Sequence, residues 1–251
     1  MAAPVSAILG LGREVGNAIA RRFDESGHKL MVADPDVGLL ETVTSKLSSD
    51  TATHHGDLHT KLGLRNCLAA TLEAYGRIDN ILLVPPIPKA DTLADMEMER
   101  FDKSLAKTTR GAILAMRIFS EHFVEQRKEP GSGLDRVRQT GTFTFVLDLS
   151  SRLSNPGQFS AAVTQSALLG VMRAGALELA GSAVRCNAIT ALRPRAEKDE
   201  PWIKSRTPLG RAALGDEIAD AALYLVSPQA AIITGETLTL DGGRQILGGL
   251  L

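Results

Sequence analysis

The sequence lacks an excess of charge of either sign and has few cysteines. Lys and Arg number 28 against 29 Asp and Glu, a net charge of -1, whereas proteins that bind nucleic acid or membrane surfaces usually carry a basic excess. Cys67 and Cys186 are too few for a disulfide framework and lack metal-site spacing. We therefore expect a cytoplasmic protein with no nucleic-acid and no membrane partner. No basic residue precedes the first apolar stretch, so no secretory signal is expected.

Long uninterrupted hydrophobic runs are also lacking. The uncharged stretch 153–172 is long enough to span a membrane, but it contains residues that are costly in lipid. These are Ser154, Asn155, Pro156, Gln158, Thr164, Gln165 and Ser166. We therefore expect this stretch to form part of a soluble domain.

Apolar runs instead alternate with amphipathic segments along all 251 residues. The pattern predicts strands at residues 5–9, 30–33, 52–56, 81–84, 143–149, 183–189 and 236–240. It predicts helices at residues 15–23, 37–47, 62–74, 97–126, 158–180 and 215–226. Strands separated by helices indicate a parallel sheet covered on both faces, so we expect one α/β domain over residues 1–251. The charged segment 125–141 is interpreted as a solvated loop.

A glycine-rich turn joins the first predicted strand to the first helix. It runs Gly10-Leu11-Gly12-Arg13-Glu14-Val15-Gly16. Glycines at such a turn let the backbone approach a pyrophosphate, which then sits at the helix N-terminus. The alternative is a tight connection that binds nothing, and the glycine pattern alone does not separate the two hypotheses.

The end of the second predicted strand bears on which dinucleotide such a turn would bind. Asp34 is placed to accept hydrogen bonds from an adenosine ribose and would repel a phosphate there, which favours NAD over NADP. Arg13 weakly favours NADP instead, because its guanidinium can pair with that phosphate.

Motifs spread over nearly the whole chain resemble the short-chain dehydrogenase/reductase family, most specifically in the last quarter. They are Gly76-Arg77-Ile78-Asp79, Asn155-Pro156-Gly157-Gln158, Ala176 to Ala180, Val184 to Ile189, Pro208 to Arg211, Asp216 to Ala219, Ile233 to Leu238 and Asp241-Gly242-Gly243. The resemblance implies a Rossmann-type, doubly wound, parallel seven-stranded sheet with helices on both faces. It also implies NAD-type cofactor binding by Gly10, Gly12, Arg13, Gly16 and Asp34, with Asp57 and Leu58 at the adenine.

The same resemblance implies that the catalytic residues are missing. Counted from Asn155-Pro156-Gly157-Gln158, the family's tyrosine and lysine fall on Ala161 and Gln165. Other residues also differ from those the family has at the matching positions. Glu14 replaces a glycine of the cofactor turn, and Leu83-Val84-Pro85-Pro86 replaces the family's Asn-Asn-Ala-Gly. Thr108 replaces an asparagine of the fourth helix, Asp148 replaces the catalytic serine, and Ala191-Leu192 replaces the Pro-Gly pair. Ser150 or Ser151 takes the serine's place if the fifth strand runs longer.

No shift in register supplies the tyrosine. The chain contains only Tyr75 and Tyr224, and the residues four positions later are Asp79 and Pro228 instead of lysine. In the family mechanism the tyrosine transfers the proton while the lysine lowers its pKa. We therefore expect no catalytic residues and a structural or regulatory subunit that binds NAD weakly and NADP less well. The alternative is an NAD(H)-dependent oxidoreductase of a small alcohol or ketone with a rearranged acid, Asp148.

Two further patterns are assigned ordinary roles. Glu14 is interpreted as a stabilising charge at a helix N-terminus, although it would also repel a pyrophosphate. The cluster His54, His55, Asp57 and His59 suggests a metal site, but the adenine contact implied for Asp57 argues against one, and we expect no metal.

The long predicted helices and the region after residue 191 bear on partners and substrate. In the family, helices matching 97–126 and 158–180 form a four-helix interface, so we expect a homo-oligomer or a hetero-oligomer with a homologous chain. The second helix offers small and apolar residues for this contact: Ala161, Ala162, Val163, Ala167, Leu168, Leu169, Gly170 and Val171.

Residues 191–210 are shorter than the family's substrate lid, which leaves little to close a pocket. A solvated connection is expected there: Arg193, Pro194, Arg195, Lys198 and Asp199.

Overall fold

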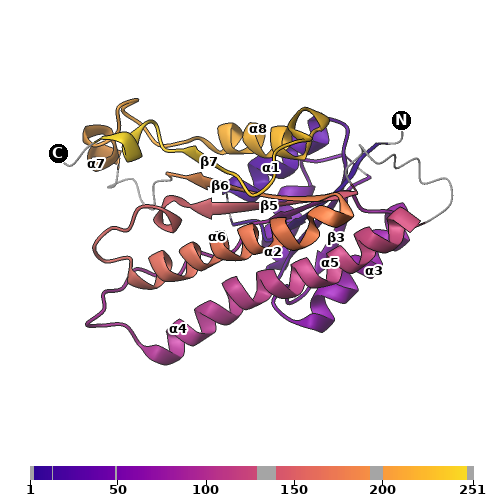
Figure 1. Cartoon of the computed structure of the whole chain (residues 1–251), viewed down its shortest axis with the longest axis horizontal. Coiled ribbons are helices and arrows are strands. Elements are labelled where there is room, and N and C mark those ends of the chain that lie inside the picture. Colours follow the sequence, from indigo (N-terminus) through magenta and orange to yellow (C-terminus); the bar gives the residue numbers. More distant parts are fainter. Residues whose placement is uncertain (1–2, 13, 49, 129–139, 193–199, 248–251) are drawn as a thin grey trace.

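The computed structural model describes residues 3–12, 14–48, 50–128, 140–192 and 200–247. In these residues one seven-stranded parallel sheet has the strand order β3-β2-β1-β4-β5-β6-β7. The strands are β1 (Val5–Leu9), β2 (Lys29–Asp34), β3 (Ala52–His55), β4 (Asn80–Leu83), β5 (Gly141–Asp148), β6 (Val184–Ala191) and β7 (Thr237–Leu240). Helices cover both faces (Figure 1). The predicted doubly wound α/β fold is therefore confirmed.

The helices form two layers. One face of the sheet packs against α1 (Glu14–Glu25), α2 (Val37–Thr44) and α8 (Gly215–Val226). The other face packs against α3 (Lys61–Tyr75), α5 (Gly111–Lys128) and α6 (Phe159–Leu179). Figure 1 shows α1 and α8 above the sheet and α5 and α6 below it.

The predicted helix 97–126 is interrupted. It consists of α4 (Met98–Leu105), one π-helical turn (Ala106–Arg110) and then α5. Single π-helical turns within α-helices are frequent at functional sites. A short helix that the sequence pattern does not predict, α7 (Glu200–Ser205), follows β6.

Local sequence explains why these elements form. All residues of β1, β4, β5 and β6 are buried, as expected for a sheet covered on both faces. The Asp36 carboxylate accepts from the backbone N–H of Leu39 and caps α2, and the Thr60 hydroxyl caps α3 in the same way through Gly63. Gly76 ends α3 with φ of 70°, a left-handed conformation that glycine adopts without strain.

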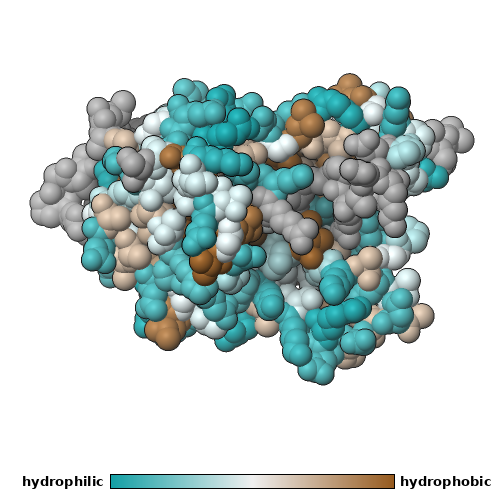
Figure 2. All heavy atoms as spheres, turned by 180° about the vertical axis from the view of Figure 1, so that it is seen from behind, coloured by the Kyte–Doolittle hydropathy of each residue, from teal (hydrophilic) through white to brown (hydrophobic). Residues whose placement is uncertain are grey.

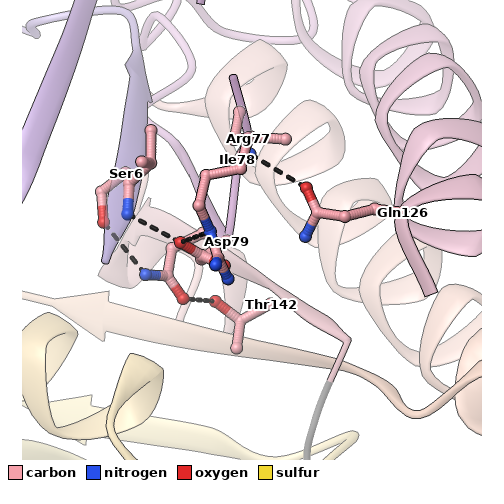
Figure 3. Close-up of polar contacts among 8 residues, drawn as sticks. Ser6, Arg77, Ile78, Asp79, Gln126 and Thr142 are labelled. Carbon is pink, nitrogen blue, oxygen red and sulfur yellow. Dashed lines mark hydrogen bonds and ion pairs between the residues drawn. The ribbon is translucent and has the colours of Figure 1, made fainter. Parts of the chain in front are cut away.

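Polar side chains tie strands together at the amino edge of the sheet. Asn80 donates to the Ser6 hydroxyl at 3.0 Å and accepts from the Thr142 hydroxyl at 2.8 Å. The Asp79 carboxylate accepts from the backbone N–H of Val5 at 2.8 Å. These bonds join β1, β4 and β5 (Figure 3), so the buried polar groups at this edge stabilise strand register.

The surface shows no large apolar area in the view opposite to Figure 1. Hydrophobic side chains there form small patches between hydrophilic ones (Figure 2), as is usual for a folded domain. Among the described helices, none is long and apolar enough to cross a membrane.

Candidate functional site

A cavity of about 220 Å³ lies at the carboxyl ends of the neighbouring strands β1 and β4, where the strand order reverses. Such a switch point, at the carboxyl ends of the strands, is where ligands bind in doubly wound sheets. Four of the residues predicted to hold a cofactor line this cavity: Gly10, Gly12, Asp34 and Leu58. Residues that were not predicted as ligands also line it, among them Pro35, His59, Lys107 and Thr108. The sequence pattern therefore locates the cavity but only part of its wall.

Two glycines of the first turn are required by the chain's own backbone. Gly10 has φ of 89°, and a Cβ there would lie 2.6 Å from the carbonyl oxygen of Val84. Gly16, which lies in α1, donates to the Leu11 carbonyl, and a Cβ at this position would lie 2.1 Å from that oxygen. Packing alone thus accounts for both glycines, so they are not specific evidence for a phosphate ligand. Arg13 lies outside the described residues.

Glu14 is the first residue of α1 and is exposed. This position fits the interpretation that its carboxylate stabilises the positive end of the helix dipole. The same position places the charge beside the turn that a pyrophosphate would have to approach.

Asp34 ends β2 with its side chain buried against the first turn. One carboxylate oxygen accepts from the backbone N–H of Leu11 at 2.8 Å, and the other accepts from the backbone N–H of Asp36 at 2.9 Å. An ionised carboxylate has about four lone-pair sites, so each oxygen retains capacity to accept another bond. Asp34 therefore positions the loop and also presents an acceptor to the cavity.

Asp57 and Leu58 occupy different environments. Leu58 is buried and lines the cavity, whereas Asp57 is exposed. The Asp57 carboxylate accepts from the backbone N–H of His59 at 2.8 Å and lies 2.9 Å from Nδ1 of its ring. The bond from the backbone N–H is the main cause that lowers the pKa of Asp57, with the His59 side chain and Lys107 contributing. This carboxylate thus holds the loop that carries Leu58.

The histidine cluster does not assemble into a ligand set. His55 lies 3.1 Å, through Nε2, from the Pro35 carbonyl oxygen, and β3 ends at this residue. His59 lies beyond the strand, beside Asp57. Across the part of the chain that the structure describes, no three His, Cys, Asp or Glu side chains are placed to hold a metal ion together.

The two positions that the motif count assigns to the family's tyrosine and lysine lie beside β5 and are fully buried. Ala161 and Gln165 both belong to the inner face of α6. The Oε1 atom of Gln165 accepts from the backbone N–H of Asp148 at 3.1 Å, and its Nε2 lies 3.5 Å from the carbonyl oxygen of Pro86. Gln165 therefore ties α6 to the end of β5 and to the segment after β4.

The other candidate polar groups of this region are also buried. The Asp148 carboxylate accepts from the backbone N–H of Ser150 at 2.9 Å at the start of a 3₁₀ turn. The hydroxyls of Ser150 and Ser151 have no hydrogen-bond partner among the described residues. Thr108 lies within the π-helical turn, and its hydroxyl donates to the Ser104 carbonyl at 2.8 Å.

Neither tyrosine is near this region. The Tyr75 hydroxyl bonds to the carbonyls of Leu30 and Asp50 and accepts from the backbone N–H of Ala52. Tyr224 is partly exposed on α8, on the other face of the sheet. Neither Tyr75 nor Tyr224 therefore lies beside Ala161.

A short helix, α7, lies in the region where little was expected to close a pocket. Ile203 of α7 is buried and packs against Leu149, which follows β5, and Leu192, which follows β6. Leu153 and Ala212 pack against the same cluster. None of these residues lines the cavity at the ends of β1 and β4, so the expectation about the pocket stays a prediction. The predicted solvated connection at residues 193–199 lies outside the described residues.

The fold and the cavity at its strand ends are typical of one class of protein, and comparison with known proteins identifies the family. A family model described as enoyl-(acyl carrier protein) reductase matches residues 10–245. The chain therefore belongs to the short-chain dehydrogenase/reductase family.

Individual relatives are distant but match along almost their full length. The chain is 25% identical over 260 residues to the (2S)-[(R)-hydroxy(phenyl)methyl]succinyl-CoA dehydrogenase subunit BbsD of Thauera aromatica, covering 98% of each chain. It is 27% identical over 253 residues to galactitol 2-dehydrogenase (L-tagatose-forming) of Cereibacter sphaeroides, covering 96% of this chain and 94% of that one.

A solved structure is similar as well. The 3-ketoacyl-(acyl-carrier-protein) reductase of Brucella melitensis, complexed with NADH, superposes with a TM-score of 0.87 at 26% identity, covering 96% of this chain and 98% of that one. Nicotinamide cofactor binding is thus a property found in the family to which this chain belongs.

Proposed function

We propose that this chain is a non-catalytic member of its family that serves as a structural or regulatory subunit. The observation that carries the proposal is the pair Ala161 and Gln165, which stand at the positions of the family's tyrosine and lysine. Alanine transfers no proton, and Gln165 carries no charge and is bonded to Asp148 and directed at Pro86. General acid–base catalysis is typically worth about 10²–10⁴-fold in rate, so its loss is severe.

The competing function is oxidation or reduction of a small alcohol or ketone with Asp148 as the proton donor. The position of Asp148 at the end of β5 favours it. Against it, a carboxylate beside a carbonyl oxygen that becomes negative opposes the developing charge unless it is protonated. Asp148 also caps a 3₁₀ turn through the backbone N–H of Ser150, which gives it a structural role.

Any dinucleotide that the chain binds is NAD in preference to NADP, and the affinity is weak. The Asp34 carboxylate at the end of β2 supports the first part, because it accepts ribose hydroxyls and repels a ribose phosphate. The exposed charge of Glu14 beside the turn supports the second part.

The subunit works as an oligomer, either homomeric or with a homologous chain. The outward side of α6 supports this proposal: Val163 is exposed, and a Cβ on Gly170 would meet no atom within 4 Å. The Thauera aromatica relative is itself named as a subunit. A cytoplasmic location is in keeping with Cys67 and Cys186, which are unpaired.

Steady-state assays of the purified chain test the proposal directly. With NAD(H) or NADP(H) and a panel of small alcohols and ketones, we expect no turnover above the uncatalysed rate. Turnover that is abolished by Asp148→Asn would overturn the proposal and establish the competing function. Turnover that survives Asp148→Asn would also overturn it and would point to a different proton donor.

A further inference from the structure

We infer that the side chains of Trp202, Arg206 and Arg244 form a binding site beside α7 for a small oxyanion, the phosphate or carboxylate group of a small molecule. None of the three residues lines the cavity at the ends of β1 and β4, so this is a second site. The inference is independent of the proposed function, because Ala161 and Gln165 take no part in it.

Two guanidinium groups converge on one indole. The Cζ atom of Arg244, in the 3₁₀ turn Arg244–Ile246 that follows β7, lies 4.2 Å from the centroid of the Trp202 ring. The Cζ atom of Arg206 lies 5.7 Å from the same centroid. Both are within the roughly 6 Å over which an aromatic face attracts a cation. The Nη1 atom of Arg244 also donates to the backbone carbonyl of Arg206 at 3.1 Å, so α7 and the turn lie side by side (Figure 1).

These two positive charges are not neutralised within the described part of the chain. No ion pair among the described residues includes Arg206 or Arg244. The carboxylate of Asp241 accepts instead from the backbone N–H groups of Gly243 at 2.9 Å and Gln245 at 2.7 Å. Burial lowers the pKa of Arg244, Arg206 lowers it further, and Asp241 opposes the shift only in part. An anion between the two guanidinium groups would offset both the burial of charge and the mutual repulsion.

Arg244 also has a donor that the described chain does not use. The residue is 9% exposed, and its Nε atom is buried with no hydrogen-bond partner among the described residues. The face of an indole attracts the charge of a guanidinium, but the N–H groups point outward from its planar edge. Thr207 Oγ1 and Gln245 Nε2, which follow Arg206 and Arg244 in the chain, are buried without a partner as well. Because buried donors are normally hydrogen-bonded, these groups indicate a ligand with several acceptor oxygens.

The exposure of the three side chains indicates how such a ligand reaches the site. Trp202 is 40% exposed and Arg206 is exposed, whereas Arg244 is buried. Arg206 therefore forms the solvent-facing side of the site and Arg244 the inner side. The planar fork of a guanidinium matches the oxygens of a carboxylate or a phosphate. The net charge of -1 for the whole chain favours one small anion over a polyanion.

Tryptophan fluorescence tests the inference, because Trp202 is the only tryptophan of the chain. The full chain is titrated with sodium phosphate, and separately with sodium acetate, at an ionic strength kept constant with sodium chloride. We expect a saturable change with at least one of them and half-saturation on the order of 1 mM. The anion that binds more tightly identifies the group as a phosphate or a carboxylate. No saturable response to either anion would overturn the inference.

Arg206→Gln tests the site with little risk to folding, because this side chain is exposed. The substitution should weaken oxyanion binding at least about tenfold, since a charge-assisted hydrogen bond is lost. Arg173→Gln, which removes an exposed arginine from α6, is the matched control and should leave the dissociation constant unchanged. Equal dissociation constants for the two variants would overturn the inference, because the anion would then respond only to net charge.

Arg244→Lys separates recognition by the planar fork from recognition by charge. Lysine keeps the positive charge but lacks Nε and the fork, so binding should weaken at least about tenfold. Dissociation constants are compared and not fluorescence amplitudes, because the substitution itself changes the surroundings of Trp202. A dissociation constant equal to that of the unaltered chain would overturn the inference.

Urea unfolding of the unaltered chain covers the case in which Arg244→Lys does not fold. A ligand that binds only the folded chain raises its stability, so a saturating concentration of the oxyanion should raise the urea midpoint. The same concentration should raise the midpoint of Arg206→Gln less. An unchanged midpoint in the unaltered chain would overturn the inference, whatever the outcome of the turnover assay.

Discussion

The two ends of the cleft use buried polar side chains in opposite ways. At the end of β2, Asp34 accepts one backbone N–H on each oxygen and still borders a cavity. Beside the end of β5, Gln165 has no exposed surface, and both halves of its amide face other parts of the chain. Asp34 and Gln165 are therefore both buried, but Asp34 borders a cavity whereas the bonds of Gln165 are made within the chain.

This difference teaches that the replacement of catalytic residues that we propose at positions 161 and 165 is structural as well as chemical. An ammonium at position 165 would be costly to bury without a charged partner, whereas an amide is satisfied by the neighbouring backbone. Ala161 leaves no polar group to satisfy. Once these side chains are in place, Ile203 can pack over the strand ends without burying an unpaired charge near them. We therefore expect substitutions beside the end of β5 to change the stability of the fold, and substitutions at the end of β2 to change ligand binding.

The largest expected effect is on stability, from Gln165→Ala. The substitution leaves the buried N–H of Asp148 without its acceptor and creates a cavity, so the free energy of unfolding should fall by about 3 kcal/mol. Urea unfolding measures this quantity.

The exposed substitution Arg173→Ala on the same helix serves as control and should change stability by less than about 0.5 kcal/mol. A Gln165→Ala variant as stable as this control would show that the Gln165 amide does not stabilise the region beside the end of β5.

Ile203→Ala should have the next largest effect. Removing this buried side chain from its contacts with Leu149 and Leu192 should lower the free energy of unfolding by about 2 kcal/mol, the low end of the usual range because the cluster is small. Lys204→Ala, one residue along on the exposed side of α7, should have almost no effect. Indistinguishable unfolding curves would mean that α7 does not pack on the strand ends in solution.

The amino edge of the sheet allows a comparison with a region that has no ligand role. His28 lies 2.8 Å, through Nδ1, from the Ser6 hydroxyl, and burial lowers its pKa from 6.5 to about 4, although Asp79 opposes the shift. The unfolded chain therefore binds the proton more readily. Stability due to neutral His28 is complete above pH 6.5 and is lost as the pH falls from there towards 4.

The expected loss is about 1–2 kcal/mol, because the imidazole is partly exposed and solvent weakens the effect. Urea unfolding at several pH values measures it. His28→Gln should flatten the dependence between pH 6.5 and 4.5. An unaltered pH profile in the His28 variant would refute the assignment.

The strands and most helices were predictable because their signals are local. Largely apolar runs mark β1 and β4, and the helical periodicity of residues 158–180 corresponds to α6. The π-helical turn at Ala106–Arg110 could not be predicted, since its sequence contains no glycine or proline that would mark a break in the helix. Helix α7 was missed because it has only six residues and its buried residue Ile203 depends on contacts with residues distant in the chain.

The candidate site was predictable in its residues but not in its geometry. The motif count identified Ala161 and Gln165, yet the bonding partners of Gln165 lie 17 and 79 residues away in the chain. Lys107 lines the cavity although only its neighbour Thr108 had been singled out. Neither periodicity nor composition indicates which side chains converge when the strand ends meet.

The smallest expected effect on the isolated chain concerns the outer side of α6. Its inner residues Leu168 and Leu169 are buried in the chain's own core, while Val163 faces outward. If the outer side contacts a second chain, Val163→Lys should bury a charge in that contact and reduce the mass measured by light scattering from a multiple of 26.7 kDa to the monomer value. The free energy of unfolding of the monomer should change by less than about 0.5 kcal/mol, because the site is exposed there. Val37→Lys, an exposed valine on α2 across the sheet, is the matched control and should leave the mass unchanged. A mass of 26.7 kDa for the unaltered chain, with no partner recovered by pull-down, would show that this side of α6 has no subunit role.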